Sequence, residues 1–187
     1  MPTDFSDYTG LIPAGTIALL QTQVRPGDGV DGILKRTRNG DAQGLDFVLA
    51  LLDTPHAKSK LFWFALVEGE TDGQKSVIER NFGMLKKIID SAKFLDPNDR
   101  SPEARAKRTV NWRDFNNVIF LGEIGIEEGK DGFPDKNILA KVITRDMPQW
   151  NGRPPIEQIT DATGAPQTPA SSAAPQAPAP IPKPPWA

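Results

Sequence analysis

With 187 residues, 38% of them hydrophobic and 25% charged, the chain is long enough for one domain with a real core. It contains no cysteine and one histidine, which excludes disulfides, thiolate zinc sites and multi-histidine metal sites. The formal net charge of −2 excludes a uniformly basic surface, so contact with a polyanion would depend on local clusters of cations.

Five strand-like runs and one helical segment follow one another along the chain. The strand-like runs span residues 16–24, 44–53, 58–67, 116–125 and 136–145. Between the third and fourth runs, apolar residues recur at three- and four-residue spacing from Ile78 to Ala92, which predicts an amphipathic helix. We expect this helix to begin at the capping-box sequence Ser76-Val77-Ile78-Glu79 and to end before Pro97.

The order of these elements indicates the fold class. Three strands, one helix and two more strands is the order of the five-stranded OB-fold, a Greek-key barrel that often binds oligonucleotides. We therefore predict a mainly β, OB-fold-like domain over residues 1–158, with a sandwich fragment as the alternative. Residues 159–187 contain eight prolines and eight alanines, too little apolar surface to offset the entropy of ordering, so we expect an extended, mobile tail.

The third strand-like run carries the most informative pattern. Because side chains alternate between the two faces of a strand, Lys58, Lys60, Phe62 and Phe64 share one face and Trp63 lies on the other. Cations beside aromatic rings are typical of an interface for single-stranded nucleic acid, since the cations follow phosphates and the rings stack on bases. Two alternatives stay open: both faces are core, or the register is flipped and Trp63 is the stacking residue.

Two long connections, over residues 25–43 and 96–115, hold the clustered cations. Long loops in a compact domain are usually functional or disordered. The candidate nucleic-acid-binding residues in these loops are Lys35, Arg36, Arg38, Arg105, Lys107, Arg108 and Trp112. We expect both loops to approach the strand face, where their cations would neutralise phosphates and Trp112 would add a stacking ring.

Carboxylates offer a possible route to an enzyme. The densest group consists of Glu123, Glu127, Glu128, Asp131 and Asp135. Such a group suggests a magnesium site for phosphodiester cleavage, but the neighbouring glycines predict a hairpin loop, and the spacing differs from that of a calcium loop. We therefore predict no catalytic site, metal or cofactor, and rank a metal-dependent nuclease third among the possible functions.

Four short segments carry a resemblance to a known family. They are Ile12-Pro13-Ala14-Gly15-Thr16, Leu61-Phe62-Trp63-Phe64, Asn81-Phe82-Gly83-Met84-Leu85-Lys86-Lys87-Ile88-Ile89 and Lys136-Asn137-Ile138-Leu139. Over roughly residues 8–145 the chain resembles phage-encoded OB-fold single-stranded DNA-binding proteins found among recombination and replication functions. The resemblance implies single-stranded DNA as the partner, no enzymatic activity, and a role in phage DNA replication or recombination.

The tail suggests a partner of a second kind. Many single-stranded DNA-binding proteins end in an acidic tip with a terminal aromatic residue that recruits replication enzymes. Here Trp186 is present without an acidic run, and a polyproline conformation would hold it away from the domain. Trp186 is thus our candidate partner-binding residue for replication or recombination proteins, and a protein-interaction adaptor is the second candidate function.

The expected compartment follows from missing signals. No apolar run reaches the roughly 18 residues that a membrane span needs, and Met1-Pro2-Thr3-Asp4-Phe5 lacks the pattern of a signal peptide. We expect a cytoplasmic protein with no membrane partner, in the host cell if it is phage-encoded. Homo-oligomerisation stays open.

Overall fold

The computed structural model describes residues 10–29, 32–53, 55–57, 59–130, 132–151, 153 and 156. The predicted tail with Trp186, and the candidate residue Lys58, lie outside this part of the chain. The elements are β1 (Thr16–Val24), β2 (Lys35–Arg36), β3 (Ala42–Leu51), β4 (Lys60–Gly69), α1 (Asp72–Ala92), α2 (Pro102–Arg108), the 3₁₀ helix η1 (Trp112–Phe115), β5 (Ile119–Glu127), β6 (Lys136–Ile143) and the 3₁₀ helix η2 (Pro148–Trp150). The fold is mainly β, with one main helix, as predicted.

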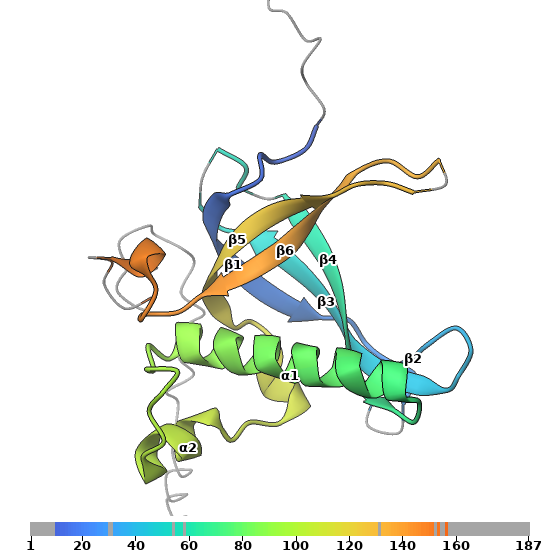
Figure 1. Cartoon of the computed structure of the whole chain (residues 1–187), viewed down its shortest axis with the longest axis horizontal. Coiled ribbons are helices and arrows are strands. Elements are labelled where there is room, and N and C mark those ends of the chain that lie inside the picture. Colours follow the sequence, from blue (N-terminus) through green and yellow to red (C-terminus); the bar gives the residue numbers. More distant parts are fainter. Residues whose placement is uncertain are drawn as a thin grey trace, which may run out of the picture.

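One antiparallel sheet contains all six strands (Figure 1). β3 lies at its centre, because it pairs with β1 and β2 along one edge and with β4 along the other. β1 also pairs with β5, and β5 pairs with β6. β4 and β6 approach each other, but no ladder joins them within the described residues, so the sheet is unclosed.

The alternation of side chains along β4 decides what the sheet exposes. Trp63 packs against the core, where its ring stacks on that of Phe47 with centroids 5.2 Å apart. Phe62 and Phe64 lie on the opposite face and are 62% and 38% exposed. The predicted alternation is confirmed, whereas a fully buried strand and a flipped register with Trp63 outside are both wrong.

The helix α1 begins earlier than predicted. Its N-cap is Thr71, whose hydroxyl accepts a hydrogen bond from the Gln74 backbone at 3.2 Å, while the Gln74 side chain accepts one from the Thr71 backbone at 3.0 Å. The prediction of a start at Ser76 is wrong because two capping-box sequences lie in succession, and the apolar stripe favoured the second.

Two polar side chains attach α1 to opposite parts of the sheet. Near the middle of the helix, Asn81 donates a hydrogen bond to the Leu66 carbonyl on β4 at 3.0 Å. Near its end, the Ser91 hydroxyl accepts one from the Leu121 backbone on β5 at 3.0 Å. Both side chains are buried, so these bonds fix the helix against two strands that do not pair with each other.

The two long connections are not plain loops. The first contains β2, and the second contains α2 and η1. The Ser101 hydroxyl accepts a hydrogen bond from the Ala104 backbone at 3.2 Å, and Pro102 stands in the first turn, so α2 has a regular start. The prediction of a long loop over 96–115 is therefore wrong, because a helix of seven residues is too short to show a 3.6-residue period.

Strand ends differ from the prediction by a few residues. β1 has the predicted bounds, whereas β5 starts at Ile119 instead of position 116. The Val118 backbone donates to the Thr22 hydroxyl at 2.9 Å, and Asn117 adopts a positive φ of 64°, so a turn precedes the strand.

No helix in the part of the chain that the structure describes has the length and apolarity to cross a membrane.

Replacing Thr71 with alanine removes the N-cap of α1 and should lower the free energy of unfolding by about 1 kcal/mol. The matched control is Ser76→Ala, which lies inside the helix and should not destabilise it, since alanine is the better helix former. Chemical denaturation measures both. Equal destabilisation by the two substitutions would contradict the assigned start.

Candidate functional site

Phe62 and Phe64 form the centre of an exposed patch on β3 and β4. Directly paired residues of antiparallel strands point to the same face. Phe62 is opposite Val48 and Phe64 is opposite Asp46, so these four side chains share one face of the sheet. We call this patch, with Lys60 and the side chains of Arg25 and Lys35 that reach it, the aromatic face.

A buried carboxylate organises the cations of the aromatic face. Asp46 is 4% exposed, and it accepts hydrogen bonds from Arg25 Nη2 at 2.5 Å and from Lys35 Nζ at 2.8 Å. Burial alone would raise the pKa of Asp46, but the hydrogen bonds and charges of Arg25 and Lys35 outweigh burial and hold this pKa below its usual value. The carboxylate is therefore charged at neutral pH.

Both exposed rings rest on neighbouring groups. The Arg25 guanidinium lies over Phe62, with 5.4 Å between Cζ and the ring centroid, which is a cation–π distance. The Phe64 ring lies over Gly44, because a Cβ atom added to this glycine would be 2.8 Å from Phe64 Cζ. A residue with a side chain at position 44 would therefore displace the ring.

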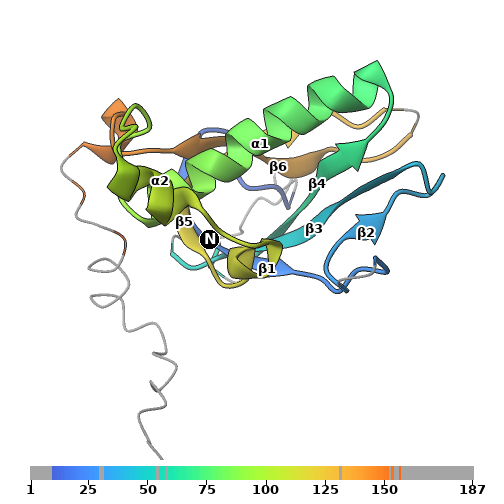
Figure 2. The ribbon, with the colours of Figure 1, turned by 90° about the horizontal axis from the view of Figure 1, so that it is seen from below.

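Two hairpins flank the aromatic face. In Figures 1 and 2 the β2–β3 hairpin and the β5–β6 hairpin extend from the same side of the molecule, with β4 between them. The first hairpin carries exposed Arg36 and Arg38, and the second carries Lys130 and Phe133, whose side chain is 75% exposed. Sequence reasoning missed Phe133 and Arg25, although an aromatic residue among glycines and charged residues is itself a signal.

The second basic cluster lies elsewhere. Gln74, at the start of α1, donates to Asp41 on the β2–β3 hairpin at 2.9 Å, whereas Arg108 on α2 contacts Asp90 near the end of α1. The helix has 21 residues, a length of about 30 Å at 1.5 Å per residue. The expectation that both clusters meet at one strand face is therefore wrong, because α1 separates Arg105, Lys107 and Arg108 from the aromatic face (Figure 1).

Arg108 has a structural role. Its Nε atom donates to Asp90 at 2.5 Å, and its terminal nitrogens donate to the carbonyls of Asp99 and Asp96 at 2.5 and 2.7 Å. The Asp90 side chain is fully buried and also pairs with Lys86 at 2.8 Å. A buried carboxylate needs such partners, so Arg108 fastens α2 to α1.

Trp112 also serves packing. Its ring stacks on Phe82 of α1, with centroids 6.2 Å apart, and on Phe115, with centroids 6.3 Å apart. It is half-buried and contacts the hydrophobic core. Trp112, the ring predicted to stack on a base, therefore joins η1 to α1 and does not lie at the aromatic face.

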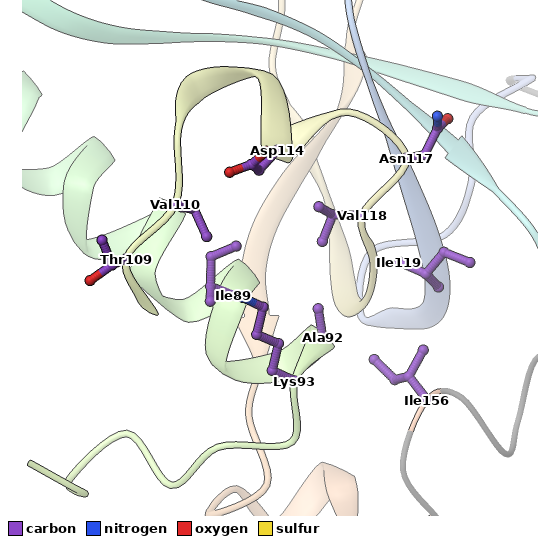
Figure 3. Close-up of a pocket in the computed structure, with 10 residues that line it drawn as sticks. All are labelled: Ile89, Ala92, Lys93, Thr109, Val110, Asp114, Asn117, Val118, Ile119 and Ile156. Carbon is purple, nitrogen blue, oxygen red and sulfur yellow. The ribbon is translucent and has the colours of Figure 1, made fainter. Parts of the chain in front are cut away.

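A cavity of about 410 Å³ lies between the end of α1, the segment before β5, and Ile156 (Figure 3). Its walls are mainly apolar, and the polar groups at its edge include Lys93 and Asp114. Lys93 donates to the Lys107 carbonyl at 2.5 Å, and Asp114 accepts from the Asn111 backbone at 2.8 Å. Both charged groups at the edge of the cavity thus make hydrogen bonds with backbone atoms of the surrounding segments.

The acidic stretch around β5 and β6 makes local contacts. Glu127 pairs with Lys136 at 2.9 Å, and Asp135 accepts a hydrogen bond from the Gly129 backbone at 2.8 Å. Asp131 lies outside the described residues. Among the residues that the structure describes, no group of three or more aspartate, glutamate or histidine side chains is arranged to hold a metal ion.

No protein-family model matches this chain, and no curated protein matches its sequence. The resemblance to phage single-stranded DNA-binding proteins thus stays a prediction. The aromatic face is the feature of the structure that bears on the function.

Replacing Arg108 with alanine should lower the free energy of unfolding by about 3 kcal/mol, because the fully buried Asp90 carboxylate would lose its more buried cation and keep only the half-exposed Lys86. Arg105→Ala on the same helix is the matched control and should change this free energy by no more than about 0.5 kcal/mol, since Arg105 is exposed. Urea denaturation of the two variants tests the assignment. A stable Arg108→Ala protein would contradict the structural role.

Proposed function

We propose that this protein binds single-stranded DNA without catalysis, and that bases stack on its aromatic face. The observation that carries the proposal is the side-by-side exposure of Phe62 and Phe64 on one face of β4. Large apolar side chains exposed together commonly mark an interaction surface. Aromatic rings suit bases, since every base has a face that can stack.

The strand arrangement supports an OB-fold as the scaffold. If β1, β3, β4, β5 and β6 are its five strands, α1 lies between the third and fourth, as in that fold. Oligonucleotides bind OB-folds on the face of strands two and three and on the loops after strands one and four. These positions correspond to the aromatic face and its two flanking hairpins, and the gap between β4 and β6 fits a partly open barrel.

The charges beside the rings support a polyanionic ligand. Lys60, Arg36 and Arg38 are exposed, and none of their side chains forms a salt bridge within the described part of the chain. The carboxylate of Asp28 accepts a hydrogen bond from the Arg36 backbone at 2.8 Å and has its pKa lowered by that bond and by the charge of Arg36. With a net charge of −2, attraction to nucleic acid would be local to this face. Stacking requires unpaired bases, so the combination favours single strands over duplexes.

The biological part of the proposal rests on the sequence resemblance. A protein that covers single-stranded DNA would support phage DNA replication or recombination in the host cytoplasm.

Salt titrations with labelled single-stranded DNA, duplex DNA and single-stranded RNA test the binding. We expect preference for single strands, with the logarithm of affinity falling by about 0.7 per neutralised phosphate for each tenfold rise in salt. Equal affinity for duplex DNA would overturn the proposal.

Replacing Phe64 with alanine should weaken binding to a single-stranded oligonucleotide by about 1–3 kcal/mol, the value of one base–aromatic stack. Phe62→Ala should weaken binding as well, because Phe62 is the other exposed ring of the aromatic face and supports Arg25. Phe82→Ala is the control, because Phe82 is 43% exposed but lies on α1 against Trp112. Fluorescence anisotropy at fixed salt measures all three variants. The stacking role fails if the Phe82 substitution costs as much affinity as the other two.

The double substitution Arg36→Ala with Arg38→Ala should reduce the salt dependence of binding by about 0.7 for each phosphate that these arginines neutralise. The corresponding pair on α2, Arg105→Ala with Lys107→Ala, should leave binding of a short oligonucleotide unchanged, because α1 separates α2 from the aromatic face. Anisotropy titrations over a range of salt concentrations give both slopes. A larger effect from the α2 pair would place the DNA along α2 and contradict binding at the aromatic face.

A further inference from the structure

The position of Asp46 is unexpected on a face that binds a polyanion. Its carboxylate is 4% exposed and lies between Arg25 and Lys35, directly opposite Phe64. A negative charge there repels phosphates, and its burial is unfavourable unless cations compensate it. The two cations that would be most valuable for binding phosphate are therefore partly neutralised by the protein itself.

The same contacts fix Arg25 in one place. Its backbone nitrogen donates to the Asp46 carbonyl at 2.9 Å, its Nη2 atom donates to the Asp46 carboxylate at 2.5 Å, and Phe62 lies beneath the guanidinium. Its side chain is nevertheless 47% exposed. The exposed part of the side chain is the part that Phe62 and Asp46 leave uncovered, and it is available to a ligand.

A guanidinium held in this way has the shape of a stacking surface. Arginine planes stack on unpaired bases, and a group that is already immobilised loses little entropy when a base arrives. Lysine has no plane, so Lys35 cannot take this role, although it shares the same carboxylate.

We propose that one base stacks on the Arg25 guanidinium rather than directly on Phe62, and that Asp46 is the residue that positions Arg25. The result is a three-layer stack of ring, guanidinium and base beside Phe64. This inference rests on the proposed binding of single-stranded DNA and adds to it a binding residue and a source of specificity.

The specificity comes from the charge balance. Two cations and one carboxylate supply one net positive charge, and phosphates cannot remove both cations without leaving Asp46 buried and unpaired. The face thus responds less to phosphate, which duplex and single strand share, than to exposed bases, which single strands alone offer.

The first test is Arg25→Lys, which keeps the charge and removes the plane. Affinity for a short oligothymidylate should fall at least about fivefold, the lower end for loss of one stack, with the salt slope and the melting temperature unchanged. Arg105→Lys, the same substitution at an exposed arginine on α2, is the matched control and should leave affinity unchanged. If the wild type prefers single strands and Arg25→Lys binds as tightly as it does, the inference is overturned and the proposed function stands. If the wild type shows no such preference, both fall.

The second test is Asp46→Asn, which keeps the shape and removes the charge. The salt dependence of single-strand binding should become steeper by about 0.7, the value for one further neutralised phosphate, and affinity for duplex DNA should rise. Asp41→Asn, at an exposed carboxylate on the β2–β3 hairpin, is the control for general charge and should not reproduce both changes. An unchanged salt slope and unchanged duplex affinity for Asp46→Asn would overturn the role assigned to this carboxylate.

Discussion

The stacking of Trp63 on Phe47 is the interaction on which the aromatic face depends. Successive side chains of a strand point to opposite faces, so packing the half-buried Trp63 against Phe47 directs Phe62 and Phe64 outward. A shift of one residue in the pairing of β3 and β4 would bury both phenylalanines and expose the tryptophan. The core therefore determines which aromatic side chains reach solvent.

The same stack continues through the protein. Phe47 meets Phe115 edge-on at 6.2 Å, and Phe115 stacks on Trp112, which stacks on Phe82 of α1. This chain of rings joins the sheet to the helix and explains why Trp112 belongs to packing. Substitutions of these stacked core rings should therefore change the stability of the protein. Phe62 and Phe64 do not belong to this row of rings.

Prediction from sequence succeeded where a regular period was available. The alternation on β4 and the apolar stripe of α1 are repeated often enough to be recognised, and the five main strands were found with small errors at their ends. β2 has two residues and depends on backbone pairing with Gly44 and Gln43, so it leaves no periodic pattern. The two basic clusters look alike in composition, and only the contacts of Gln74 with Asp41 and of Arg108 with Asp90 show that they lie at opposite ends of α1.

Acidic residues decide what each cation does. Asp90 engages Lys86 and Arg108 within the fold, and Asp46 fixes Arg25 and Lys35 on the surface. A count of positive charges along the sequence treats these cations as equal to Lys60, Arg36 and Arg38, whose side chains form no salt bridge with the residues that the structure describes. Because Arg25, Lys35 and Arg108 meet their carboxylates across different elements of the fold, the effect of these pairs appears only once the chain is folded.

Photo-crosslinking to an oligonucleotide that carries 5-iododeoxyuridine, followed by mass spectrometry of the peptides, tests the central claim most directly. Halogenated bases of this kind react with aromatic side chains on which they stack. The account predicts a crosslink within β4 at Phe64, because the Arg25 guanidinium lies over Phe62 and separates that ring from its base. Crosslinks confined to Phe82 or Trp112 would contradict it, as would none at β4 under conditions where the oligonucleotide is bound.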